Sequence, residues 1–173
     1  VYKGQIIKSQ VDFHSEYGGV VPELAARQHM QSLPALVDLL LSKHNIGFTD
    51  LKYIAVTSGP GLKGCLLVGL SYAKGLSEAL NIPLIPINHL EGHVLSFSLE
   101  HDDENMYPLL CLLVSGGHSE IIKVEAVGKY IILCQTGDDA AGEAFDKIGT
   151  CVWPIATAKE IIIIINLLTL PLK

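Results

Sequence analysis

The chain has 173 residues, of which 49% are hydrophobic and 17% are charged, so a hydrophobic core can form and general disorder is excluded. Its 12 basic and 18 acidic residues give a formal net charge of −6. This charge argues against a self-sufficient nucleic-acid binder, because phosphate contacts favour a basic surface; a nucleic-acid substrate would need a local basic patch, a missing segment or a partner protein.

The first half of the chain alternates strands and helices. We predict a strand over 5–11, a helix from Pro22 to about Asn45, a strand over 53–57, a helix over about 62–80 and a strand over 84–87. Pro34 should kink or divide the first helix, because proline lacks the N–H that an inner helical position needs. Asn88 is placed to cap a further helix that carries His89 and His93.

The second half opens with strands. After a charged connector over 101–105, we predict strands over 109–114, 120–125 and 130–135, and a helix over 138–148 with an acidic first turn. This succession indicates an α/β protein of two related lobes. We place the first lobe at residues 1–100, the start of the second at 106–149 and a divergent apolar tail at 150–173.

The segment His89-Leu90-Glu91-Gly92-His93 is the first candidate site. Residues four apart share one face of a helix, so both imidazoles can bind one metal ion, zinc or iron. Two surface or capping histidines are the commoner explanation of an isolated pair with this spacing. A zinc protease needs a glutamate directly after the first histidine, where Leu90 stands, and no residue is obviously the third ligand.

Two glycine-rich turns are further candidates. Ser115-Gly116-Gly117-His118 lies between two predicted strands, where successive backbone N–H groups can form an anion site or an ordinary hairpin turn. Ser58-Gly59-Pro60-Gly61 joins a strand to a helix, and this junction can bind phosphate or simply allow tight packing.

An acidic segment, 137–147, sets carboxylates among alanines and glycines. In a helix its residues Asp139, Gly142, Glu143 and Asp146 would share a face. Such a face is either solvated or suited to binding hydroxyl groups or a metal.

The order and spacing of five segments resemble the TsaD-type family, and the resemblance covers residues 4–149. The segments are Val21–His29, Ser58–Leu62, Asn88–His93, Leu113–His118 and Asp138–Lys147. The family carries the older name O-sialoglycoprotein endopeptidase, or glycoprotease. Because its related non-catalytic partner lacks the histidine pair, the chain resembles the N-terminal half of the catalytic subunit.

The resemblance implies a fold, a reaction and a site. The fold is α/β, an actin-like, sugar-kinase-like two-lobed fold of the ASKHA type, here incomplete. The reaction moves a threonylcarbamoyl group from threonylcarbamoyl-adenylate to the exocyclic amine of a tRNA adenosine next to the anticodon. The implied site residues are His89 and His93 for one divalent metal, iron or zinc, then Leu113, Val114, Ser115, Gly116 and Gly117 for the adenylate, and Asp146 for its ribose hydroxyls. No residue is assigned to proton transfer.

The resemblance also implies tRNA, the adenylate, a homologous non-catalytic subunit and a small ATPase as partners. The longest apolar run, 161–172, is too short to span a bilayer, no leader sequence is visible, and the four cysteines form no Cys-x-x-Cys pair. We therefore expect a cytoplasmic protein with reduced cysteines.

The sequence departs from the family at both ends. Family members open with two strands that contain a Gly-x-Glu-Thr-Ser-Cys segment, and beyond Gly149 they continue to a glycine-rich adenine site and an aspartate metal ligand, whereas this chain ends in an isoleucine-rich run. We expect an incomplete chain that is inactive alone. The alternatives are a zinc metalloprotease and a non-catalytic nucleotide-binding scaffold of the same fold.

Overall fold

The computed structural model describes residues 4–96, 107–114, 118–141, 144 and 165–166. It contains two compact units, Val1–Gly92 and His93–Lys173, and the division falls within the short helix α4 (His89–Val94). Four predicted site residues, Ser115, Gly116, Gly117 and Asp146, lie outside the described residues, as does most of the tail.

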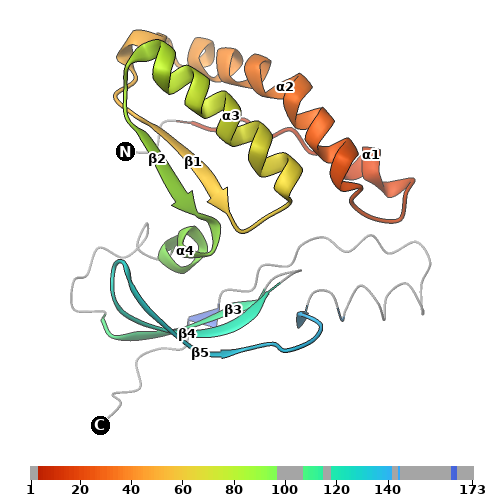
Figure 1. The fold of residues 1–173 in the computed structure, drawn as a ribbon, viewed down its shortest axis with the longest axis vertical. Coiled ribbons are helices and arrows are strands. Elements are labelled where there is room, and N and C mark those ends of the chain that lie inside the picture. Colours follow the sequence, from red (N-terminus) through yellow and green to blue (C-terminus); the bar gives the residue numbers. More distant parts are fainter. Residues whose placement is uncertain (1–3, 97–106, 115–117, 142–143, 145–164, 167–173) are drawn as a thin grey trace. The chain divides into compact units, whose positions relative to one another are not determined.

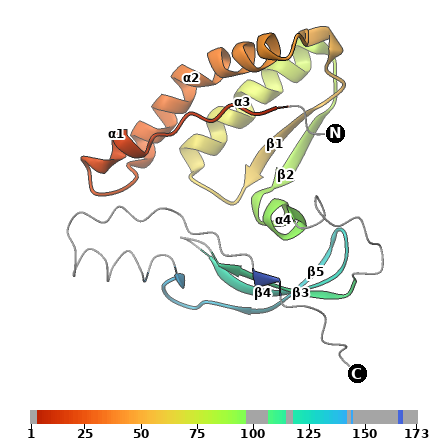
Figure 2. The same ribbon diagram turned by 180° about the vertical axis from the view of Figure 1, so that it is seen from behind.

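The first unit is built on a strand–helix–strand crossover. Its elements are α1 (Val11–Ser15), α2 (Pro22–Lys43), the 3-10 helix η1 (Phe48–Asp50), β1 (Ile54–Gly59), α3 (Lys63–Leu80) and β2 (Leu84–Asn88). The two strands are parallel, with Ile54 opposite Leu84, and α3 supplies the long connection that parallel strands require. Figures 1 and 2 show α3 beside the strand pair and α2 alongside α3.

Small residues let α3 approach both of its neighbours. A Cβ at Gly64 would lie 3.1 Å from the Cβ of Ala26 in α2, and one at Gly69 would lie 3.7 Å from Val56 in β1. Gly64 therefore sets the distance between α2 and α3, whereas a Cβ at Gly69 would make only an ordinary contact with β1.

Both long helices end in the same way, at an asparagine followed by an isoleucine. Asn45 and Asn81 take left-handed backbone conformations with φ of 51° and 50°. The N–H groups of Ile46 and Ile82 then bond back to the carbonyls of Leu41 and Ser77. This is the Schellman arrangement, in which asparagine tolerates the positive φ that usually calls for glycine.

The prediction of a strand over residues 5–11 is wrong. Residues 4–10 have no regular structure, and α1 begins at Val11. A segment becomes a strand only beside a neighbour, and within the described residues β1 pairs with β2 alone. The apolar residues here are not a buried face either, since Ile7 is 76% exposed.

Pro34 was predicted to kink or divide the first long helix; the division is wrong, because α2 runs unbroken through this residue, and the kink stays a prediction. Proline removes the hydrogen bond to the carbonyl four residues earlier, which belongs to Met30. Met30 is an exposed position, so water can take the place of the missing donor.

The second unit is an antiparallel sheet with the strand order β5-β4-β3-β6. Its strands are β3 (Leu109–Val114), β4 (Ser119–Ala126), β5 (Lys129–Gln135) and the two-residue β6 (Ile165–Asn166). The three predicted strands are thus confirmed within one or two residues at each end. Val114 pairs with Ser119, which confirms that the first two strands are neighbours across the 115–118 turn.

One face of this sheet is buried, as the alternation along β3 and β4 requires. The buried residues of the two strands are Cys111, Leu113, Glu120, Ile122 and Val124. Cross-strand pairs such as Leu113 with Glu120 and Cys111 with Ile122 bring these side chains onto the same face.

The helix predicted from Asp138 begins later. Residues 138–140 are not helical, Ala141 and Ala144 are, and the Ala144 N–H bonds to the Ala140 carbonyl at 2.9 Å. Asp139 therefore precedes the helix and does not share a helical face with later residues. The other residues of the segment, including Asp146, lie outside the described part.

The α/β class is confirmed by these elements, whereas the actin-like two-lobed arrangement stays a prediction. Within the described residues, no helix is long and apolar enough to cross a membrane.

Candidate functional site

The histidine pair lies in α4, directly after β2. The Asn88 side-chain oxygen accepts hydrogen bonds from the N–H groups of Leu90 at 2.9 Å and Glu91 at 3.2 Å, which confirms the predicted cap. His89 is the first residue of α4 and His93 lies in its last turn, one turn of helix apart. The cap fixes where the helix starts, and with it the face on which both imidazoles lie.

Two imidazoles on one helical turn suit a divalent metal such as zinc or iron. Over the described residues no group of three or more histidine, cysteine, aspartate or glutamate side chains is arranged to hold a metal. The metal half-site at His89 and His93 therefore stays a prediction from their spacing.

Cys111 is not a candidate ligand or nucleophile. It lies in β3 with 8% of its surface exposed, and this burial raises the pKa of its thiol. Since the thiolate is the reactive and metal-binding form, a buried thiol of raised pKa is structural.

The predicted adenylate segment is described at its first two residues. Leu113 is 2% exposed, so its side chain belongs to the core. Val114 is half-buried and ends β3. The turn that follows, residues 115–117, lies outside the described part.

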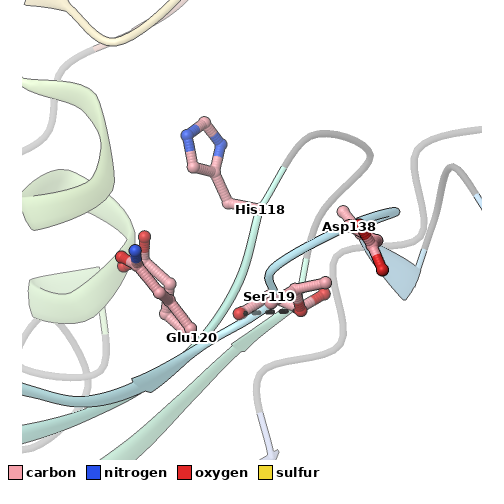
Figure 3. A pocket seen from close by; sticks show the side chains of 7 residues that line it. His118, Ser119, Glu120 and Asp138 are labelled. Carbon is pink, nitrogen blue, oxygen red and sulfur yellow. Dashed lines mark hydrogen bonds between the residues drawn. The ribbon is translucent and has the colours of Figure 1, made fainter.

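A polar cavity of about 280 Å³ lies where β4 begins and β5 ends. Its lining includes His118, Ser119, Glu120, Gln135, Thr136 and Asp138. Figure 3 shows the labelled side chains of His118, Ser119, Glu120 and Asp138 around it. Hydroxyl, amide, imidazole and carboxylate groups therefore meet beside the predicted phosphate turn.

Ser119 makes more hydrogen bonds around this cavity than the sequence indicated. Its carbonyl accepts from the Thr136 N–H at 2.9 Å and from the Thr136 hydroxyl at 3.1 Å. The dashed line beside Ser119 in Figure 3 marks the hydrogen bond from the Thr136 hydroxyl to the Ser119 carbonyl. Its own hydroxyl accepts from the Ala141 N–H at 2.9 Å, which explains why helical structure begins at Ala141 instead of Asp138.

Glu120 is a second residue of this cavity that was not predicted from the sequence as a site residue. It is 9% exposed and pairs across the sheet with Gln135 on one side and Leu113 on the other. The only sequence signal was its place in the alternation of β4, where a carboxylate stands at a position that otherwise carries apolar residues.

The other glycine-rich junction, Ser58–Gly61, lies at the end of β1. The Ser58 hydroxyl donates to the Ile87 carbonyl at 3.2 Å and so ties the end of β1 to β2. A Cβ at Gly59 would meet nothing within 4 Å, and one at Gly61 would meet Leu66 at 3.5 Å, so close packing does not explain these glycines.

Comparison with known proteins confirms the resemblance. A family model described as "TsaD: tRNA N6-adenosine threonylcarbamoyltransferase" matches residues 3–163. A protein of that name from Clostridioides difficile (strain 630) is 54% identical over 143 residues, which are 83% of this chain and 42% of the relative. Its namesake from Clostridium perfringens (strain SM101 / Type A) is 51% identical over 147 residues, 85% of this chain and 43% of the relative.

The chain thus spans about two fifths of the length of these curated relatives. Among solved structures, YeaZ from Pseudomonas aeruginosa gives a TM-score of 0.48 at 15% identity, over 77% of this chain and 68% of that chain. This likeness is too low to add weight to the fold. The family match over nearly the whole sequence, together with identities above half, shows that the chain belongs to the TsaD family.

Proposed function

We propose that the chain is the first portion of an enzyme that transfers a threonylcarbamoyl group from threonylcarbamoyl-adenylate to the exocyclic amine of a tRNA adenosine next to the anticodon. In this reaction the amine nitrogen attacks the carbamoyl carbon, the bond from that carbon to the phosphate oxygen breaks, AMP leaves, and the amine gives up one proton. The observation that carries the proposal is the TsaD family match over residues 3–163.

His89 and His93 are the residues that would hold the metal. A divalent ion bound there, iron or zinc, would supply Lewis-acid polarisation of the carbamoyl oxygen. The contribution of the chain is orientation: the Asn88 cap fixes the start of α4, and the helical spacing sets both imidazoles on one face.

The backbone of the segment Leu113–Gly117 would bind the adenylate phosphate. The buried Leu113 side chain anchors the strand that precedes these residues in the sequence. Asp146 would accept hydrogen bonds from the ribose hydroxyls. We also propose that the chain comprises a first lobe at residues 1–100, the start of a second lobe at 106–149 and a divergent tail at 150–173.

The tRNA would be bound mainly by other components. A net charge of −6 gives this chain little general attraction for phosphates. A homologous non-catalytic subunit, a small ATPase and the remaining length of the family's proteins are the proposed sources of the missing contacts.

The protease alternative has less support, because Leu90 stands where a zinc protease carries its glutamate base. A non-catalytic scaffold of the same fold would bind AMP and leave tRNA unmodified under every condition, which distinguishes it from the transferase.

Calorimetry with AMP tests the nucleotide part of the proposal. The unmodified chain should bind AMP weakly, at roughly 1 mM, since two or three charged hydrogen bonds carry the interaction. Gly116→Val should block backbone approach and Asp146→Ala should remove the ribose acceptor, each weakening binding by roughly tenfold or more. Affinity that is unchanged in both variants would mean that the site lies elsewhere.

A further inference from the structure

The ends of β1 and β2 are joined at an irregularity in their pairing. Thr57 pairs with Ile87, and Gly59 pairs with Asn88. Ser58 is therefore an extra residue of β1 between the two pairs, and an extra residue of this kind redirects its side chain. The Ser58 hydroxyl donates to the Ile87 carbonyl at 3.2 Å. A side chain thus holds the end of β2 at the point where the regular pairing of the strands is interrupted.

The same end of β2 leads directly into α4. The Ile87 carbonyl and the Asn88 N–H belong to one planar peptide unit, so a hydrogen bond to this carbonyl also orients the backbone of Asn88. The Asn88 side chain accepts from the N–H groups of Leu90 at 2.9 Å and Glu91 at 3.2 Å. Helix α4 begins at the residue after Asn88. The contacts therefore form a continuous series from β1, through the cap, to the helix that carries the histidine pair.

We propose that Ser58 is a positioning residue of the histidine pair in α4. Its hydroxyl orients the Asn88 cap, and the cap sets the turn of helix on which His89 and His93 lie. Two imidazoles bind one metal ion only when both ring nitrogens reach it, so the metal affinity of the pair depends on this orientation. The inference rests on the proposed function, which assigns a divalent metal to the two histidines.

Two variants at this position isolate the hydroxyl. Ser58→Ala removes the donor, and Ser58→Thr keeps it. The hydrogen bond is exposed to solvent, so its loss should leave the fold intact and act through orientation. Ser77→Ala is the matched control, because the Ser77 hydroxyl also donates to a backbone carbonyl, that of Ile82 at 2.6 Å, but at the end of α3, before β2 begins.

Zinc titration followed by NMR of the histidine side chains is the first readout, because it reports on His89 and His93 separately from the other histidines. Zinc affinity at this pair should fall about fivefold in Ser58→Ala and return in Ser58→Thr. Asn88→Ala should lower the affinity about tenfold. Adding Ser58→Ala to Asn88→Ala should lower it no further, because the serine acts through the cap. Ser77→Ala should leave the zinc affinity unchanged.

Amide hydrogen exchange in α4 is the second readout, and it needs no metal. Relative to Ser58→Thr, Ser58→Ala should speed exchange of the Leu90 N–H, which bonds to the Asn88 side chain, by about fivefold. Exchange of the Leu66 N–H, which bonds to the Leu62 carbonyl in the first turn of α3, should not change.

Three results would overturn the proposal. Equal Leu90 exchange in the alanine and threonine variants would show that the Ser58 hydroxyl does not hold the cap. Additive losses of zinc affinity from Ser58→Ala and Asn88→Ala would show that the serine does not act through the cap. Faster exchange with unchanged zinc affinity would reduce Ser58 to a structural residue. Absence of zinc binding at the two histidines of the unmodified chain is a different failure, since it contradicts the proposed metal half-site itself and its positioning with it.

Discussion

Cysteine reactivity follows burial within a single sheet. Cys111 is buried in β3 and its thiol pKa is raised, whereas Cys134 is exposed in β5. In the folded chain at about pH 8, iodoacetamide should label Cys134 roughly tenfold faster than Cys111 or more, because the thiolate must be both formed and reached. Peptide mapping by mass spectrometry gives the rates. In guanidinium, where the chain is unfolded, the two cysteines should be labelled at comparable rates. Comparable labelling rates in the folded chain would contradict the burial of Cys111.

Glu125 carries the clearest acid-sensitive contact. A hydrogen bond from Lys123 at 2.8 Å, then the charge of Lys123, lowers the pKa of this carboxyl below its ordinary value of 4.5. Because the folded-state pKa is the lower one, the contribution of the pair to stability is present above the unfolded-state pKa and disappears as pH falls through the folded-state value. The pair is largely exposed, so that contribution is small.

Lys123→Met should therefore raise the pKa of Glu125 toward 4.5, as read from the carboxyl carbon in an NMR titration. Lys129→Met, which removes only a weaker charge effect, should raise it less. An equal rise in both variants would assign the shift to general charge and not to the hydrogen bond.

At the scale of elements, the contact between α2 and α3 depends on Gly64. Gly64→Val would crowd Ala26 and should lower the free energy of unfolding by roughly 1–3 kcal/mol. Gly75 lies in the same helix with open space around it, so Gly75→Ala should raise that free energy by roughly 0.5–1 kcal/mol. Chemical denaturation measures both. The close packing of these helices would be refuted if the valine variant were as stable as the unmodified chain.

The helix α4 is the element that carries the proposed metal half-site. After loading with zinc or ferrous iron and dialysis, elemental analysis should show that His89→Ala and His93→Ala each lose the bound metal, because one imidazole alone holds a metal poorly. His29→Ala, in α2, should retain it. Tight metal that survives both α4 substitutions would place the metal elsewhere.

The elements that could be predicted are those set by residues close together in the sequence. The strand–helix–strand order of β1, α3 and β2 and the Asn88 cap follow from local sequence patterns, and both were predicted, whereas the parallel pairing of β1 with β2, which places Ile54 opposite Leu84, was not. Whether residues 4–10 form a strand depends on the presence of a neighbouring strand, and the periodicity of the sequence does not show this. The start of the helix at Ala141 and the importance of Ser119 depend on one hydrogen bond across 22 residues, for which the sequence holds no local signal.

At the scale of the whole molecule, the chain matches the TsaD family over residues 3–163 and spans about two fifths of the length of its relatives. The proposed site is correspondingly partial, with two imidazoles for the metal and one turn and one carboxylate for the adenylate. The transferase activity that we propose is that of proteins of the relatives' full length, of which this chain spans about two fifths.

Reconstitution in trans tests this central claim most directly. The chain is mixed with the segment of the Clostridioides difficile relative that follows the matched region, the partner subunits, threonylcarbamoyl-adenylate and tRNA, and tRNA nucleosides are then analysed by mass spectrometry. We predict threonylcarbamoyladenosine from the mixture, none from either part alone, and none when the chain carries His93→Ala. No product from the mixture, under conditions in which the full-length relative modifies the tRNA, would contradict the account.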